Sequence, residues 1–353
     1  MGAETGYSKS RKGDKMKHRK RTALILCLLV TGVFFVNSSA LGQIKLSYSV
    51  FFPAPHKNAV LATDWAKEIE KRTNGKVQIT VFPGGTLTPA DKCYDGVVKG
   101  ISDIGFSVLA YTRGKFPLTE VSDLPLGMKT GLVATKVIND YYKKFRPKEF
   151  NEVQVMYLHG HGPGILHTKK EVTKLEDAKG MKIRCTGMAA KIAGALGATP
   201  VAMPMGDTYD ALSRGVVDAS MAPQEALQGW KWGEVVKYTV EDWAASYSSG
   251  MFVVMNKDKW KSLPPDVQKI IEQVNEEYIE KQGRTWDEID KVGRDYTIAR
   301  GNKIISLSPD ENLKWEKAVK PLLDEYKKNM KDKGLPGDEV LSFYLQTIYK
   351  YQK

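Results

Sequence analysis

The stretch "IKLSYSVFFPAPHKNAVLATDWAKEIEKRTNGKVQITVFPGG", residues 44–85, decides the fold class. Its apolar start over 44–52 predicts a β-strand. Residues 56–75 then place apolar side chains at helical spacing and end at a glycine, as helices commonly do. Alternating apolar and polar residues over 76–85 predict a second strand that ends in a Pro-Gly-Gly turn. A strand, a helix and a strand in this order predict parallel strands joined by a helical crossover.

The same alternation continues along most of the chain. Further helices are predicted at 89–100, 131–145, 188–197, 206–214, over most of 262–301, and at 309–330 with a kink at Pro321. Further strands are predicted at 101–109, 153–160, 251–256 and 303–308, and in "GILHTKK", "MKIRCTG", "TPVAMP" and "VVDASMAP". The sequence therefore predicts two α/β units, with the chain crossing between them near residues 160 and 249. Ligands of such proteins bind where strand ends face the cleft between the units.

The net charge of +12 is concentrated at the N-terminus. Residues 1–21 carry eight Lys and Arg and two acidic residues, and an uncharged apolar run over 22–36 follows, then the small residues "NSSALGQ". This order is typical of a secretory signal peptide, predicted here over 1–42, and the apolar run is short for a membrane span. The remaining charge, +12 less the +6 of residues 1–21, is a dispersed +6. We expect a soluble, exported protein that binds no nucleic acid.

Catalytic and cofactor motifs are missing from the sequence. There is no phosphate-binding G-x-x-x-x-G-K-[ST] and no G-x-S-x-G, and "GHGPG" (160–164) does not fit G-x-G-x-x-G. His159 and His161 are spaced as H-x-H, but no further metal ligands stand near them in sequence. These histidines are expected to hydrogen-bond a turn, or, for His161, to contact a ligand. Cys93 and Cys185 are expected to be free, buried thiols. We predict no enzyme, no metal and no cofactor.

The strand "KGMKIRCTG" (179–187) carries an arginine at its centre, Arg184. On a surface strand this side chain would pair with an acid such as Glu176 or Asp177. In a ligand pocket its planar guanidinium would bind a carboxylate through two parallel hydrogen bonds. The residues of this strand alone leave both interpretations open.

Other candidates follow from their positions at predicted strand ends or on loops that face the cleft. His56, Ser107 and Ser248 are expected to offer polar contacts. Trp230 and Trp232 stand two apart on a predicted helix and so face different ways, with Trp230 the candidate for a cleft wall. Among the remaining candidates, packing or hinge roles are expected for Tyr111 and Tyr209, and helix capping or ammonium binding for Glu225.

Several stretches together resemble one family. They are "FFPAPHKNAVLATDWAKEIEKRTNGKVQITVFPGGTL", "GVVKGISDIGF", "LEDAKGMKIRCTG", "ALGATPVAMPMGDTYDALSRGVVDA" and "EVVKYT". Their order over residues 44–330 resembles the solute-binding proteins of TRAP transporters, the DctP-like family. The resemblance implies an α/β, two-lobed periplasmic binding protein fold with hinge strands and a long lobe-spanning helix. It also implies a monomeric periplasmic receptor that delivers a small organic anion to the small and large membrane subunits of a TRAP permease. The expected segments are a signal peptide at 1–42, lobe I at 43–162 plus 249–287, and lobe II at 163–248 plus 288–353.

The resemblance places Arg184 at the arginine that usually pairs with the ligand carboxylate. Other positions depart from the pattern of sialic-acid and C4-dicarboxylate binders. Gly164 stands near an additional arginine, Ala222 at a ligand-binding asparagine, Phe51 at a polar residue and Met205 at an aromatic one. These changes favour a monocarboxylate with an apolar or aromatic body, because a second charge would be left unpaired. The predicted ligand-binding set is Arg184, Phe51, Phe52, His56, Ser107, His161, Gly164, Met205, Met221, Ala222, Trp230 and Ser248.

Three alternatives stay open. The ligand could be a C4-dicarboxylate, a sulfonate or an amine. A receptor of similar shape could instead serve an ATP-driven importer or a sensor kinase. A secreted hydrolase or lyase would need a nucleophile with its base, or a metal cluster, and the sequence shows neither.

Overall fold

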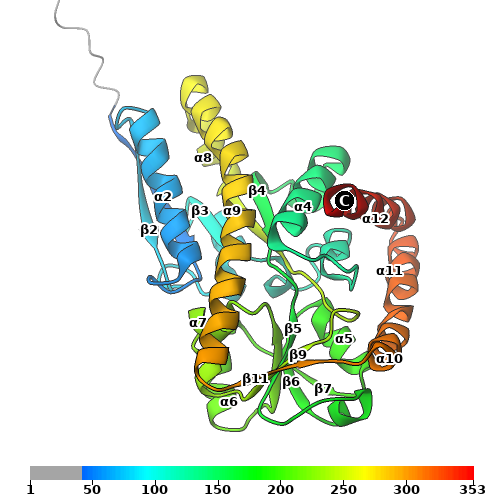
Figure 1. The fold of residues 1–353 in the computed structure, drawn as a ribbon. Helices are drawn as coiled ribbons and strands as arrows, with labels where there is room; N and C mark the ends of the chain where they lie inside the picture. Colours follow the sequence, from blue (N-terminus) through cyan, green and yellow to red (C-terminus); the bar gives the residue numbers. More distant parts are fainter. Residues whose placement is uncertain (1–41) are drawn as a thin grey trace, which may run out of the picture. The chain divides into compact units, whose positions relative to one another are not determined.

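The computed structural model describes residues 42–353, and Gln43–Lys353 form one compact unit. The predicted signal peptide lies, but for its last residue, outside the described residues. The unit contains two β-sheets of five and six strands with helices around them (Figure 1). No helix among the described residues has the length and apolarity needed to cross a membrane.

The first sheet has the predicted parallel start. Its strands, in spatial order, are β2 (Val77–Phe82), β1 (Ile44–Val50), β3 (Ile104–Val108), β10 (Gly250–Asn256) and β4 (Val153–Gly160). β1 pairs in parallel with both β2 and β3, and the crossover between β1 and β2 is α2 (Lys57–Arg72). The short α3 (Cys93–Val98) leads into β3, and α4 (Gly131–Phe145) into β4. β10 arrives from much later in the chain and lies antiparallel between β3 and β4.

The second sheet is built from residues after β4. Its strands, in spatial order, are β11 (Lys303–Ser306), β9 (Tyr238–Glu241), β5 (Ile165–Thr168), β8 (Ala219–Ala222), β6 (Lys182–Cys185) and β7 (Thr199–Ala202). Its helices are α5 (Met188–Ala195), α6 (Met205–Ser213) and α7 (Ala226–Gly229). The prediction of one helix carrying Trp230 and Trp232 is wrong, because α7 ends before Trp230 and Lys231 adopts a left-handed φ of 60°.

The chain passes between the sheets twice, and the two passing segments meet. One leads from β4 to β5 and the other from β9 to β10. Gly164 of the first pairs with Tyr247 of the second, and the Gly164 amide donates to the Tyr247 carbonyl at 2.7 Å. This pairing lies near the crossing points at 160 and 249 that the sequence predicts.

A single long helix spans both sheets. After the short α8 (Lys257–Ser262), α9 runs over Pro265–Ala299 without a break. It contacts α2, α4 and β4 around the first sheet and α7 and β11 at the second. Figure 1 shows this helix in yellow to orange alongside both parts. The predicted two-lobed α/β fold with a lobe-spanning helix is confirmed.

The C-terminal helices connect the second sheet back to the first. They are α10 (Pro309–Val319), α11 (Pro321–Asp332) and α12 (Gly337–Gln352). Pro321 begins a new helix instead of kinking one, because proline fits the first helical position. α12 was not predicted, and it packs against α4, a helix of the first sheet's surroundings (Figure 1). At this contact the Tyr344 ring lies 5.4 Å from that of Tyr141. The predicted lobe boundaries stay a proposal, and this packing argues for assigning α12 to lobe I.

Candidate ligand-binding site

A cavity lies between the two sheets. It contains about 380 Å³ of space between protein atoms, part of it open to solvent. Both sheets, both crossing segments and α9 contribute to it. Its walls are Phe51, Phe52, Val108, Tyr111, His161, Arg184, Thr186, Met205, Met221, Ala222, Pro223, Glu225, Tyr247, Ser249, Met251 and Trp286.

Arg184 supplies the only Lys or Arg side chain among these wall residues. β6 carries it at the cavity, where the residue is only 3% exposed. Its Nε and Nη2 donate to the Met203 carbonyl at 3.0 and 2.7 Å, which fixes the plane of the guanidinium. Within residues 42–353 no carboxylate lies within 4.0 Å of it, so the expected alternative of a surface pair with Glu176 or Asp177 is not present.

One of the two outer nitrogens of Arg184, Nη1, has only a weak hydrogen-bond partner. Nη1 contacts only the thioether sulfur of Met205, at 3.3 Å, and a thioether accepts hydrogen bonds poorly. A buried, unpaired charge is costly unless something neutralises it. The guanidinium therefore keeps N–H donors, and an unbalanced charge, for an anion that enters the cavity.

Tyr111 links the two sides of the cavity. It follows β3 of the first sheet, and its hydroxyl oxygen accepts from the backbone amide of Met205 at 3.1 Å and from Arg184 Nη2 at 3.5 Å. Both bonds use the oxygen as acceptor, so the hydroxyl hydrogen is available to a ligand oxygen beside Arg184. The sequence expected packing or a hinge role for Tyr111, and the structure adds this direct contact with the cavity.

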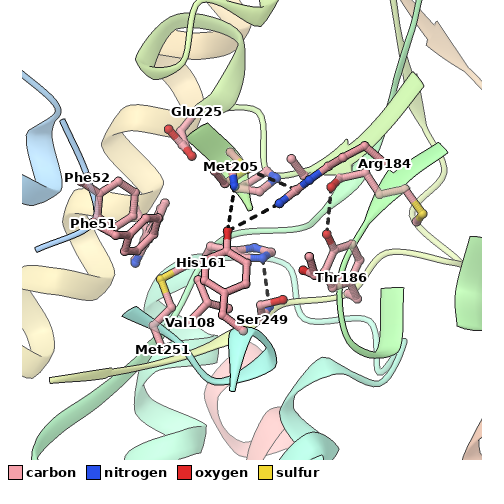
Figure 2. Close-up of a pocket in the computed structure, with 16 residues that line it drawn as sticks. Phe51, Phe52, Val108, His161, Arg184, Thr186, Met205, Glu225, Ser249 and Met251 are labelled. Carbon is pink, nitrogen blue, oxygen red and sulfur yellow. Dashed lines mark hydrogen bonds between the residues drawn. The ribbon is translucent and has the colours of Figure 1, made fainter. Parts of the chain in front are cut away.

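The opposite wall is aromatic. The rings of Phe51 and Phe52 lie 4.0 Å apart, and Figure 2 shows this pair facing Arg184 across the cavity. Trp230 stacks on Phe51 at 6.2 Å from outside the lining. Burial of an aromatic ring against such walls is favourable, since each ring removes a large apolar area from water.

His161 lines the cavity, but both of its ring nitrogens are already occupied. Nδ1 donates to the Gly162 carbonyl and Nε2 accepts from the Ser249 amide at 2.9 Å, so the ring ties the two crossing segments together. Burial, with the nearby charge of Arg184, lowers the His161 pKa to about 4. A ligand therefore meets a neutral ring with no free nitrogen.

The H-x-H spacing does not form a metal centre. His159 accepts from the Trp286 indole at 3.0 Å through Nδ1, and burial lowers its pKa to about 3. Among residues 42–353 no group of three or more His, Cys, Asp or Glu side chains could hold a metal ion. Cys93 and Cys185 are buried and free, as predicted.

The structure places seven of the twelve predicted residues on the cavity and five behind it. On the cavity are Arg184, Phe51, Phe52, His161, Met205, Met221 and Ala222. Behind it are His56, Ser107, Gly164, Trp230 and Ser248. Ser107 and Ser248 donate instead to the carbonyls of Ala90 and His161, at 2.7 and 2.6 Å. Gly164 lies against the ring of Tyr247, and His56 contacts Glu225. Their contact with a ligand stays a prediction.

Several wall residues were not in the predicted set: Val108, Tyr111, Thr186, Pro223, Glu225, Tyr247, Ser249, Met251 and Trp286. Thr186 and Ser249 directly adjoin the observed strands β6 and β10. Thr186 lies inside the stretch "MKIRCTG" that was predicted as a strand, and Ser249 two residues before the predicted strand at 251–256. Trp286 comes from the middle of α9, where an apolar helical position carries no local sign of a cavity.

A family model describes most of the chain. Residues 53–329 match the model for DctP, bacterial extracellular solute-binding protein, family 7. The chain belongs to this family. This match confirms the resemblance to the solute-binding proteins of TRAP transporters. The family is one of solute-binding receptors, not of enzymes.

Solved structures of TRAP solute-binding proteins resemble this receptor along nearly their whole length. One from Desulfovibrio salexigens is 35% identical, with 88% of this chain and 97% of that chain covered and a TM-score of 0.78. One from Rhodoferax ferrireducens, in complex with copurified benzoate, is 29% identical, with coverages of 88% and 99% and a TM-score of 0.83. One from a marine metagenome, specific for aromatic acid ligands and in complex with metahydroxyphenylacetate, is 28% identical, with coverages of 88% and 100% and a TM-score of 0.83.

Proposed function

We propose that this TRAP solute receptor captures a monocarboxylate with an aromatic or other apolar body. The observation that carries the proposal is the unpaired guanidinium of Arg184 opposite the Phe51–Phe52 pair. A carboxylate against Arg184 gains charge-assisted hydrogen bonds from a guanidinium that is almost fully buried. The rest of such a ligand is then buried between aromatic and methionine side chains, which favours an apolar body.

A second carboxylate would find no cation among the wall residues. Ala222 offers only a methyl group, and His161 is neutral with both nitrogens in use. Glu225, the one acidic side chain among the wall residues, would repel another carboxylate. Desolvating an anion without a partner is costly, so dicarboxylates should bind poorly.

Two of the solved relatives support the same ligand class. The receptor from Rhodoferax ferrireducens was solved with benzoate and the metagenomic receptor with metahydroxyphenylacetate. Each ligand has one carboxylate and one aromatic ring. Because these receptors share the fold of this chain, we expect its cavity, too, to bind a carboxylate at one end and an aromatic ring at the other.

We also propose that the receptor works in the periplasm as a monomer, exported by residues 1–42. There it would deliver its ligand unchanged to the small and large membrane subunits of a TRAP permease. Membership of the family supports this role. Conversion of any bound ligand into a product would contradict it.

A ligand panel tests the proposal. Calorimetry on the purified receptor should compare benzoate, phenylacetate and mandelate with succinate, malate, benzenesulfonate and benzylamine. We expect at least one aromatic monocarboxylate to bind with a dissociation constant in or below the micromolar range, and no measurable heat with succinate or malate. Tight binding of either dicarboxylate, or of benzylamine alone, would contradict the assigned ligand class.

A further inference from the structure

The cavity has a second ionisable side chain at a distance from Arg184. Glu225 precedes α7 and lines the cavity, and the residue is only 2% exposed. It forms no ion pair with Arg184 within 4.0 Å. His56 connects it to the aromatic wall instead, because the His56 ring stacks on Phe52 at 4.4 Å and contacts Glu225. The cavity therefore has a cationic end and a carboxylate end.

The hydrogen bonds of His56 show which group is the donor at this end. Its Nδ1 accepts from the backbone amide of Asn58 at 3.2 Å, because an amide N–H can only donate. The ring proton is therefore on Nε2, which donates to Glu225 Oε2 at 2.8 Å. Within residues 42–353 the other carboxylate oxygen, Oε1, has no hydrogen-bond partner. Glu225 is thus an acceptor with one oxygen unused.

The pair is held in place from behind. A Cβ on Gly229 would lie 2.7 Å from both Glu225 Oε2 and His56 Nε2, so glycine at this position lets the pair pack against the backbone. Asp290 accepts from the backbone amide of Glu225 at 2.8 Å and fixes the start of α7. The carboxylate of Glu225, a residue of the cavity wall, is therefore preorganised rather than mobile.

From this geometry we infer that the ligand carries a hydrogen-bond donor, a hydroxyl or amino group, at the end away from its carboxylate. The inference rests on the proposed function and narrows it to hydroxyaryl or aminoaryl monocarboxylates. The donor would bind Glu225 Oε1 while the carboxylate binds Arg184. An unsubstituted aromatic acid would close the cavity over an unpaired carboxylate oxygen, which is costly. A site built to accept such a group discriminates strongly against analogues that lack it.

Matched ligands test this on the unmodified receptor. Calorimetry should compare benzoate and phenylacetate with their 3- and 4-hydroxy, 3- and 4-amino, and 3- and 4-methoxy derivatives. We expect at least one hydroxy or amino acid to bind about tenfold tighter than both its parent acid and its methoxy analogue, because the methoxy group cannot donate. If no donor-bearing acid binds more than about threefold tighter than its parent, the inference is wrong.

The variant Glu225→Gln identifies the acceptor. Its carbonyl oxygen can still accept from His56, which directs its NH₂ group, a donor, toward the ligand. The preference for hydroxy over methoxy acids, measured as the ratio of their dissociation constants within the variant, should disappear. A preference that persists in this variant would overturn the role of Glu225. Absence of binding by every aromatic acid would instead contradict the proposed function, so the two failures are distinguishable.

Discussion

A Cβ on Gly164 would lie 2.5 Å from Cε1 of Tyr247, so the tyrosine ring occupies the space that a side chain at position 164 would need. The ring is held there because its hydroxyl donates to the Met221 carbonyl at 3.0 Å. The resemblance places an additional arginine of other family members near this position. In this receptor the ring of Tyr247 forms that part of the cavity wall. Arg184 is therefore the only Lys or Arg side chain among the wall residues.

The variant Gly164→Ala tests this packing. The methyl group would force the Tyr247 ring or the crossing segments apart, and such overpacking typically costs about 1–3 kcal/mol of unfolding free energy. Denaturant unfolding monitored by circular dichroism measures it. Gly194→Ala is the matched control, because position 194 is a helical residue with open space around it and should be neutral or slightly stabilised. Equal stabilities of both variants would contradict the account.

The variant Tyr111→Phe removes the hydroxyl that joins the two sides of the cavity. The buried amide of Met205 then loses its acceptor, and a ligand carboxylate loses a donor beside Arg184. We expect affinity for the tightest aromatic acid of the panel to fall roughly five- to thirtyfold, the cost of about one to two kcal/mol. Calorimetry measures the change.

Tyr209→Phe serves as the control for that variant. Tyr209 belongs to α6, and its hydroxyl donates to Glu234 at 3.0 Å on the protein surface, away from the cavity walls. Affinity should be unaffected. If both tyrosine variants bind the acid as tightly as the unmodified receptor, Tyr111 has no part in ligand binding.

Asp123 gives the receptor a pH-dependent stability that a variant can isolate. It accepts hydrogen bonds from the Gly250 amide and the Ser249 hydroxyl at the start of β10, and burial raises its pKa to about 7. Unfolded aspartate has a pKa of about 3.9. The folded state therefore retains a proton that the unfolded state releases between these values. The contribution of Asp123 to stability is complete below about pH 4 and is lost as the pH rises to about 7.

The variant Asp123→Asn mimics the protonated acid at every pH. Unfolding free energies should be measured for both proteins from pH 4 to 9. The variant should gain stability relative to the unmodified receptor as the pH rises toward 7, by at most about 1.4 kcal/mol per pH unit, and the difference should be constant above pH 8. Buried histidines such as His161, whose pKa is lowered to about 4, make the unfolding free energy rise with pH. This effect is the same in both proteins and cancels in the comparison. A pH-independent difference would contradict the raised pKa.

Local patterns were enough to predict most of the fold. The strand and helix periods between β1 and β4 are set by short-range burial, and the structure places α4 and β4 at the predicted residues. The helix α12 escaped prediction because its apolar face is buried by tertiary contacts, above all with α4, about 200 residues earlier in the chain. The predicted helix through Trp230 and Trp232 is likewise absent, because Lys231 adopts a left-handed conformation that the sequence pattern does not indicate.

The cavity was predictable only where one residue carries the chemistry. Arg184 was predicted because an arginine at the centre of a short strand is unusual unless it binds a surface acid or a ligand. The structure favours the ligand, since the side chain is buried and has no carboxylate partner among the described residues. The pairing of His56 with Glu225 spans 169 residues, and nothing near either residue indicates it. Likewise, the space beside Gly164 could not be assigned to Tyr247 before the two crossing segments were seen to pair.

The most direct test of the account is the affinity of the variant Arg184→Met for the tightest aromatic monocarboxylate, measured by calorimetry beside Arg214→Met. Arg214 is exposed at the end of α6, so its variant matches the change in net charge without touching the cavity. The account predicts that Arg184→Met weakens binding by about a hundredfold or more, as loss of a buried charge partner does, with Arg214→Met unchanged. The melting temperature of the unliganded Arg184→Met protein should change little, because the loss of the hydrogen bonds to the Met203 carbonyl is offset by removal of a buried, unpaired charge. Unchanged affinity in a folded Arg184→Met receptor would contradict the central claim.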